Sequence, residues 1–261
     1  MGISSLIVAF VLEGGSVASL IGVSAGIIVL GGTIGATMIS YPKKDIAKVP
    51  KLIGRAFKEE TIDYKGIINY FLDLSQHARS NGLLSLEANI QSEEINKYDP
   101  ILKESLELVV DGIDIELIKE TMENRIYIQD RSLKREAAIF ESAGGYSPTM
   151  GIIGTVMGLV HVLGNLDKPE TLGPSIAVAF IATLYGVGLA NLFWLPIAEK
   201  LKNKAQAITT AREMMLEGCL SLHTGENPKI IEKKLMTFLE GQEYKAGNPL
   251  PEGEAINAEE K

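Results

Sequence analysis

Three long stretches of this sequence contain no Asp, Glu, Lys or Arg. They cover residues 14–42, 142–166 and 171–198. A helix rises about 1.5 Å per residue and the hydrocarbon core of a bilayer is about 30 Å thick, so uncharged runs of roughly 18 residues or more are long enough to cross it. The pattern predicts membrane-spanning helices and excludes an ordinary soluble enzyme.

The uncharged stretches divide into four predicted spans. These are residues 3–12, 18–39, 148–166 and 176–197. The first is the weakest, because ten residues cover about 15 Å, half of the bilayer core. Pro148 is interpreted as an ordinary proline at the start of the third span, whereas Pro196 near the end of the fourth is expected to kink it.

The segment between the second and third spans has the opposite character. Residues 43–141 hold 15 Lys and Arg and 19 Asp and Glu. Residues 63–79 and 113–141 are predicted to be helical, the second as a long charged segment that runs into the third span. Strand alternation and hairpin dipeptides are absent from the sequence. We therefore expect an all-α fold: a polytopic membrane protein with four transmembrane helices and a helical cytoplasmic domain.

Basic residues predict the orientation. Eleven of them flank the second, third and fourth spans on one side: Lys43, Lys44, Lys48, Lys51, Arg55, Arg131, Lys134, Arg135, Lys200, Lys202 and Lys204. The positive-inside rule places that side, and both termini, in the cytoplasm. The predicted domains are residues 1–42 (transmembrane helices 1 and 2), 43–141 (cytoplasmic helical domain), 142–198 (transmembrane helices 3 and 4) and 199–261 (cytoplasmic C-terminal helices and a disordered tail).

Composition excludes several chemistries. The single cysteine, Cys219, cannot form an intramolecular disulfide or a cysteine-based zinc cluster. The three histidines are scattered, so a metal site is not expected. The formal net charge of −8 argues against nucleic acid as a partner. Neither a Gly-rich phosphate loop nor a nucleophile paired with histidine is recognisable, so no enzymatic activity is predicted.

Small residues recur at helical spacing in the second and third spans. They are Gly22, Gly26, Gly31, Gly35, Gly154 and Gly158. Pairs of glycines four residues apart let helix backbones approach closely in a membrane. The spacing is compatible with packing inside one subunit and with packing between identical subunits around a shared axis.

The last two spans carry polar groups but no ionisable carboxylate or amine. Their hydroxyls include Thr155 and Thr183. A cation pathway normally needs a strongly coordinating group at mid-membrane. Either this chain conducts nothing, or a partner helix brings the carboxylate and these hydroxyls line the path. A threonine in a helix most often bonds a carbonyl of its own turn, which is the simpler interpretation of each.

Four motifs together resemble one family. They are LGGTIGATMISYP at residues 30–42, RSNGLLSLE at 79–87, GGYSPTMGIIGTVMGLVHVL at 144–163 and GPSIAVAFIATLYGVGLANLFWLPIA at 173–198. In this order they resemble the flagellar stator A subunits, the MotA family within the MotA/TolQ/ExbB proton channel family. The resemblance covers nearly the whole chain.

The resemblance implies a torque-generating subunit of the bacterial inner membrane. It implies a ring of five A subunits around two single-span MotB-type subunits whose aspartate binds the transported ion, with no cofactor besides that H⁺ or Na⁺. Arg79 and Glu87 match the charged pair that contacts the rotor protein FliG. Pro148 and Pro196 match the prolines that couple ion flow to movement, and Thr155 and Thr183 match hydroxyls that line the ion path.

Two other functions remain open from the sequence. A TolQ or ExbB relative uses the same last two spans to power outer-membrane processes, but has one span before its large cytoplasmic loop, whereas two are predicted here. A helical membrane scaffold would conduct nothing and bind partners through residues 43–141. The coupling ion also stays open, because Ala182 stands where the sodium-driven branch commonly has threonine.

Overall fold

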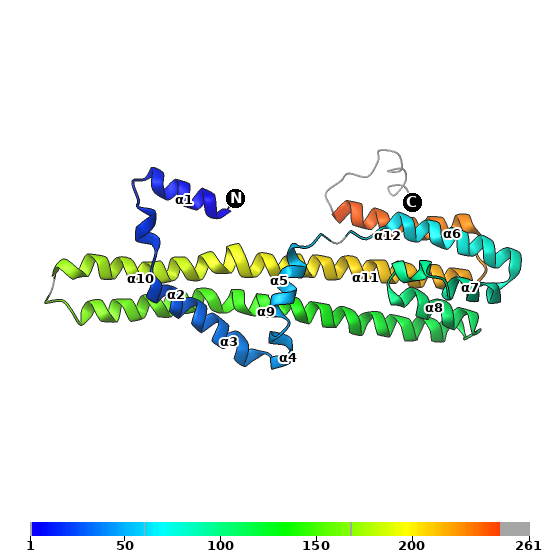
Figure 1. Cartoon of the computed structure of the whole chain (residues 1–261), viewed down its shortest axis with the longest axis horizontal. Coiled ribbons are helices and arrows are strands. Elements are labelled where there is room, and N and C mark those ends of the chain that lie inside the picture. The colour runs from blue at the N-terminus through cyan, green and yellow to red at the C-terminus, as the bar shows by residue number, and fades with distance from the viewer. Residues whose placement is uncertain (1, 60, 168, 246–261) are drawn as a thin grey trace, which may run out of the picture. The chain divides into compact units, whose positions relative to one another are not determined.

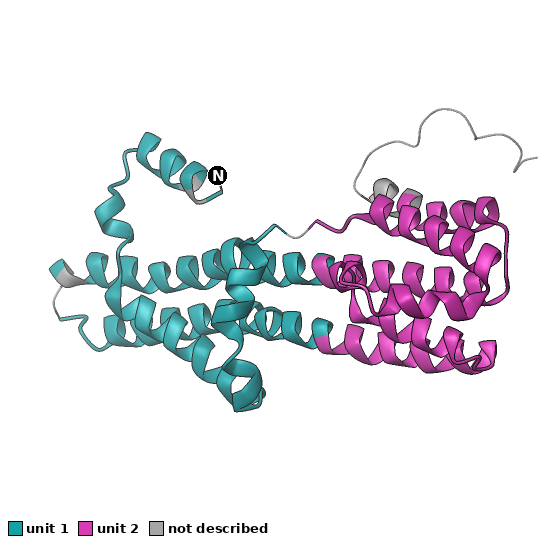
Figure 2. Ribbon diagram, turned by 45° about the vertical axis from the view of Figure 1, so that its right-hand side comes forward, with its two compact units in different colours: residues 1–59, 133–203 teal, residues 60–132, 204–261 magenta. Residues whose placement is uncertain are grey.

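The predicted all-α fold is confirmed by a computed structural model, which describes residues 2–59, 61–167 and 169–245 and contains no β-strand among them. The predicted disordered tail lies outside the described residues. Packing divides the chain into two compact units, residues 1–59 with 133–203 and residues 60–132 with 204–261 (Figure 2). The domain boundaries expected from charge stay a prediction.

The elements are numbered in chain order in Figure 1. Those before residue 60 are α1 (Gly2–Leu12), η1 (Val17–Leu20), α2 (Val23–Gly26), η2 (Ile27–Gly31), α3 (Gly32–Ser40), α4 (Lys43–Ile46) and α5 (Val49–Phe57). The middle of the chain forms α6 (Tyr64–Asn81), η3 (Leu83–Leu86), α7 (Glu87–Ile90), η4 (Glu94–Lys97) and α8 (Pro100–Val110). The rest forms α9 (Ile115–Leu163), α10 (Pro169–Leu189), η5 (Ala190–Trp194), α11 (Leu195–His223) and α12 (Pro228–Lys245).

Three helical segments of the described chain are long and apolar enough to cross a membrane. They are Val17–Ser40, Ile115–Leu163 and Leu172–His223. Helix α1 has 11 residues, which is too short to span a bilayer core unaided. The three long segments agree with the second, third and fourth predicted spans, and the first span, α1, stays a prediction.

Helix α9 shows that the interpretation of Pro148 as a helix start is wrong. The helix runs without a break through 49 residues, and Pro148 lies inside it. The charged segment and the third span are one helix, so no N-terminus forms at residue 148. Because proline has no N–H, the carbonyl of Gly144 lacks the donor that a helix normally supplies four residues later.

The turn before Pro196 is a π-turn. The N–H of Leu195 donates to the carbonyl of Ala190, five residues earlier. A proline ring crowds the carbonyl four residues before it and supplies no N–H, and a wider turn relieves both problems. A second π-turn, η2, lies within the second span.

In the unit of residues 60–132 and 204–261, helices α6, α8, α12 and the adjoining parts of α9 and α11 enclose one apolar core. Its largest fully buried side chains include Phe71, Leu102 and Met214. The Asp63 side chain caps α6 by accepting from the Gly66 N–H at 2.8 Å. This cap fits the helix predicted for residues 63–79.

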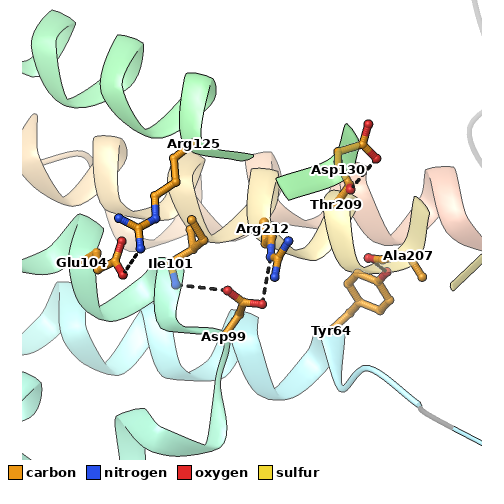
Figure 3. Close-up of polar contacts among 9 residues, drawn as sticks. All are labelled: Tyr64, Asp99, Ile101, Glu104, Arg125, Asp130, Ala207, Thr209 and Arg212. Atoms are coloured by element: carbon orange, nitrogen blue, oxygen red, sulfur yellow. Dashed lines mark hydrogen bonds and ion pairs between the residues drawn. The ribbon is translucent and has the colours of Figure 1, made fainter. Parts of the chain in front are cut away.

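Buried and half-buried polar groups tie the helices of this unit together (Figure 3). Asp99 caps α8 through the Ile101 N–H at 3.1 Å and accepts from Arg212 Nε at 2.8 Å, joining α8 to α11. The Thr209 hydroxyl donates to Asp130 Oδ1 at 3.0 Å, joining α11 to α9. These bonds fix the register of helices whose apolar faces alone would permit sliding.

Candidate functional site

The last two spans pack backbone against backbone. A Cβ atom added at Gly151 of α9 would lie 2.8 Å from the Ala182 carbonyl oxygen of α10. One added at Gly186 would lie 2.7 Å from the Ser147 carbonyl oxygen and 2.9 Å from the Gly151 Cα. The buried Ser147 hydroxyl donates to the Gly186 carbonyl at 2.9 Å. Only glycine fits at both positions, and the contact sets the register between α9 and α10.

The predicted packing glycines fall into two groups. Added Cβ atoms at Gly154 and Gly158 would lie 2.6 Å from the Cβ atoms of Ala182 and Ala179, so both glycines lie in the same α9–α10 seam. At Gly22 an added Cβ would meet Ile181 at 3.0 Å. These glycines contact neighbouring helices of their own chain.

Gly26 lies at the edge of that packing, where an added Cβ would be 3.8 Å from Tyr185. At Gly31 and Gly35 an added Cβ would meet no heavy atom of the described chain within 4 Å. The predicted Gly31 and Gly35 pair therefore leaves a smooth strip of the second span open within the described chain.

Thr155 and Thr183 come together across the seam. Their Oγ1 atoms are 2.5 Å apart, and Thr155 Oγ1 also lies 3.1 Å from the Gly151 carbonyl and 2.9 Å from the Ala179 carbonyl. One hydroxyl carries one proton, so these acceptors compete for the Thr155 donor. The bond to the helix's own turn that the sequence suggested is present, and a cross-helix bond accompanies it.

A groove of about 420 Å³ lies beside this seam, between α2, η2, α9 and α10. Most of its lining is apolar or glycine, and its polar side chains are Ser24, His161 and Ser175. It contains no carboxylate or amine from this chain. No group of three or more His, Cys, Asp or Glu among the described residues is arranged to hold a metal ion.

Sequence reasoning assigned no role to Tyr185. Its hydroxyl accepts from the Gly22 N–H at 3.1 Å and donates to the Leu20 carbonyl at 2.7 Å. These two backbone groups lie where the second span is interrupted between η1 and α2, so they lack helical partners. Tyr185, on α10, thus supplies hydrogen-bond partners for backbone groups at the interruption in the second span.

Arg79 and Glu87 belong to the unit that holds α6. Arg79 is in the last turn of α6 and Glu87 begins α7, and both are exposed. Gly82, with φ of +86°, ends α6 between them. That backbone conformation favours glycine.

Among the described residues, three long apolar helical segments, two of them in backbone contact, define an all-α membrane protein. A family model described as "MotA/TolQ/ExbB proton channel family" matches residues 93–214, and a second, "Motility protein A N-terminal", matches residues 1–82. The chain is 38% identical to motility protein A of Bacillus subtilis (strain 168) over 98% of its length and 93% of that protein. It is 32% identical to chemotaxis protein PomA of Vibrio alginolyticus, covering 91% of each chain.

The chain therefore belongs to the MotA group of the MotA/TolQ/ExbB proton channel family and is a multi-pass protein of the inner membrane. A solved structure of the flagellar MotAB stator complex from Bacillus subtilis superimposes with a TM-score of 0.84 at 38% identity, covering 95% of this chain and 96% of that one. A structure of C. jejuni MotAB also gives a TM-score of 0.84, at 28% identity. The family is defined by ion conduction, a role without catalysis.

Proposed function

We propose that this chain is the A subunit of a flagellar stator. With a MotB-type single-span subunit it forms an ion channel that uses the transmembrane proton or sodium gradient to generate torque on the rotor. The observation that carries this function is the match over nearly the whole chain to motility protein A and to MotAB stator complexes. The N-terminal match favours it over a TolQ or ExbB role, because that model describes motility protein A alone.

The polar groups of the spans support a shared ion path. The uncharged stretches 142–166 and 171–198 supply no carboxylate, so the group that binds the transported ion comes from the partner. Thr155 and Thr183 supply hydroxyl oxygens that accept from a protonated carboxyl or coordinate a cation. Protonation or cation binding changes which acceptor the Thr155 proton prefers, and that links occupancy of the partner's carboxylate to the α9–α10 seam.

The hydroxyl role is tested by comparing valine and serine at each threonine. Valine keeps the branched shape but removes the hydroxyl, whereas serine keeps the hydroxyl. In tethered cells that depend on this stator, rotation speed is expected to fall strongly with Thr155→Val or Thr183→Val and to be retained with Thr155→Ser or Thr183→Ser. If the valine and serine variants rotated at equal speeds, at equal membrane levels, the hydroxyls would have no role in the ion path.

The rotor contact is proposed to involve Arg79 and Glu87. Both are exposed charges, which contribute little to folding on average, so a large effect of reversing them on torque would indicate a partner. We expect Arg79→Glu to abolish rotation without lowering membrane levels. Lys65→Glu is the matched control, because Lys65 is also exposed and lies in the same helix, α6. If the control lost rotation as completely as Arg79→Glu, the effect would be one of net charge.

Pro148 and Pro196 are proposed to couple ion flow to movement. Each removes a backbone donor from a long helix, and one follows a π-turn, so bending costs less there than in an uninterrupted helix. Pro148→Ala and Pro196→Ala are expected to keep the fold and to reduce torque per ion. If both variants produced native torque at high load, these prolines would have no role in coupling ion flow to movement.

The topology and assembly follow the same proposal. Four spans, with α1 as the first, put both termini and residues 43–141 in the cytoplasm, and five copies surround two B subunits. The measurement for orientation is labelling from the periplasm of a cysteine in the turn between the first and second spans, such as Ser16→Cys, because Ser16 is exposed. Labelling only after permeabilisation would reverse the assigned topology.

A further inference from the structure

The segment that follows the second span is strongly basic. Residues 43–58 contain six Lys and Arg and one Asp, although the whole chain has a formal net charge of −8. The segment starts three residues after α3 ends at Ser40, so it begins within about 10 Å of the end of a membrane span. Lys51 and Arg55 are four residues apart in α5 and therefore share one side of it, and Lys58 follows the last residue of the helix.

The protein itself holds this segment in place. Leu52 and Ala56 of α5 are buried in a cluster that includes Phe140 of α9 and Leu201 of α11. The side of α5 that carries Leu52 and Ala56 is thus covered by protein, and the exposed side chains of the helix include Lys51 and Phe57.

Hydrogen bonds and ion pairs to α9 fix the beginning of the segment. The Tyr41 hydroxyl donates to the Ala138 carbonyl at 2.8 Å. Asp45 pairs with Arg135 at 3.2 Å, and Lys48 pairs with Glu136 at 3.2 Å. Because the single acidic side chain of the segment is already paired, it does not neutralise the remaining lysines.

Three lysines of the segment are left for another partner. Lys43, Lys44 and Lys51 are exposed, and none of them forms an ion pair with the described residues. Nearby, the Phe57 side chain is 65% exposed, with Lys200 Nζ 5.6 Å from its ring centroid. An exposed aromatic ring among basic side chains at the end of a span is the composition of a membrane-interface anchor.

We propose that residues 43–58 form a binding surface for anionic phospholipid head groups of the adjoining leaflet, with Lys43, Lys44 and Lys51 contacting the head groups and Phe57 entering the interface. Charge complementarity selects this occupant, because an anionic leaflet attracts juxtamembrane basic residues by roughly fivefold in binding per residue. The position of the segment, next to a span and held by folded protein, favours lipid over a soluble partner. The alternative is that these lysines only set orientation during insertion.

The test uses the intact A–B complex in detergent, titrated with short-chain phosphatidylglycerol or phosphatidylcholine while its thermal unfolding is followed. The variant Lys43→Gln/Lys44→Gln/Lys51→Gln removes three positive charges. The matched control, Lys103→Gln/Lys229→Gln/Lys233→Gln, removes three charges from exposed lysines of α8 and α12.

We expect phosphatidylglycerol to stabilise the native complex and the control at the same concentration. The first variant should need a phosphatidylglycerol concentration at least about tenfold higher for the same stabilisation. In phosphatidylcholine the three proteins should have the same thermal midpoint. Equal phosphatidylglycerol midpoints for the two variants, or equal effects of both lipids on the native complex, would overturn the proposal.

A second measurement covers the case in which the first variant fails to insert. Binding of phosphatidylglycerol to the native complex is measured at low and at high salt, because contacts between lysines and head groups are screened by ions. A midpoint that rises several-fold with salt supports the proposal, and a midpoint that is unchanged overturns it.

Discussion

Substituting Gly186 by alanine tests the backbone contact between the last two spans. The added Cβ would lie 2.7 Å from the Ser147 carbonyl oxygen and 2.9 Å from the Gly151 Cα. Both neighbours are backbone atoms, so α9 and α10 must separate by about 0.5–0.7 Å to reach ordinary contact at 3.4 Å. A separation of that size forfeits a quarter to a half of the dispersion energy of the atoms concerned.

The expected cost follows from three contributions. Overpacking of a tight contact costs about 1–3 kcal/mol. Lengthening the buried bond from the Ser147 hydroxyl to the Gly186 carbonyl, now 2.9 Å, costs about 1 kcal/mol more. The better helix propensity of alanine offsets up to about 1 kcal/mol. The Gly186→Ala chain should therefore be about 1–3 kcal/mol less stable than the native chain.

Gly188→Ala is the matched control in the same helix. An added Cβ at Gly188 meets no heavy atom of the described chain within 4 Å, so this variant gains helix propensity without a clash. Thermal unfolding of the purified A–B complex should separate the two variants by roughly 5–10 °C, with Gly186→Ala the lower. Identical midpoints for the two variants would refute the backbone contact.

Three further predictions concern tyrosines and one ion pair. Tyr185→Phe removes both hydrogen bonds to the interruption in the second span and should lower stability by about 1–3 kcal/mol, read from thermal unfolding. Tyr70→Phe should raise it, because the Tyr70 hydroxyl is buried and finds no hydrogen-bond partner among the described residues. Glu226→Gln should flatten the loss of stability in acid, because a hydrogen bond from Lys234 holds the pKa of Glu226 below its ordinary value.

The pH dependence of the last two follows from the sign of each shift. Burial raises the pKa of Tyr70 from 10.0 to about 12, so this hydroxyl ionises first in the unfolded chain and lowers stability further as the pH rises from 10 toward 12, a loss that Tyr70→Phe removes. The Glu226 pKa is lowered, so its contribution is present at neutral pH and is lost as the pH falls below about 4.3. If Tyr70→Phe unfolded at the same alkaline pH as the native chain, or Glu226→Gln at the same acid pH, these pKa assignments would be wrong. For Tyr185→Phe, a thermal midpoint equal to that of the native chain would contradict the predicted hydrogen bonds.

The sequence predicted those features that depend on local pattern. Uncharged runs located the three long spans, and the helix predicted for residues 63–79 is present as α6, Tyr64–Asn81. Both threonines were expected in spans, but their 2.5 Å approach depends on the register that Gly151 and Gly186 set between two helices. Periodicity in one helix carries no information about that register.

Contacts distant in sequence escaped prediction for the same reason. Tyr185 is separated by more than 160 residues from the backbone groups that it pairs. A buried tyrosine hydroxyl usually has a hydrogen-bond partner, but the sequence does not indicate which one. Pro148 was misinterpreted because prolines favour the first turn of a helix. In this chain a single helix continues from the charged segment into the membrane, and that continuity makes the proline an interior residue.

The glycine contact between α9 and α10 also limits how these spans can move. Two helices whose backbones already touch at Gly151 and Gly186, with a hydrogen bond across the contact, have no slack for sliding or tilting against each other. Helices can slide past each other when flexible side chains separate their backbones, and no side chain separates the two backbones at this contact. Bending within each helix is instead easiest where a backbone donor is missing, at Pro148 in α9 and at the π-turn before Pro196.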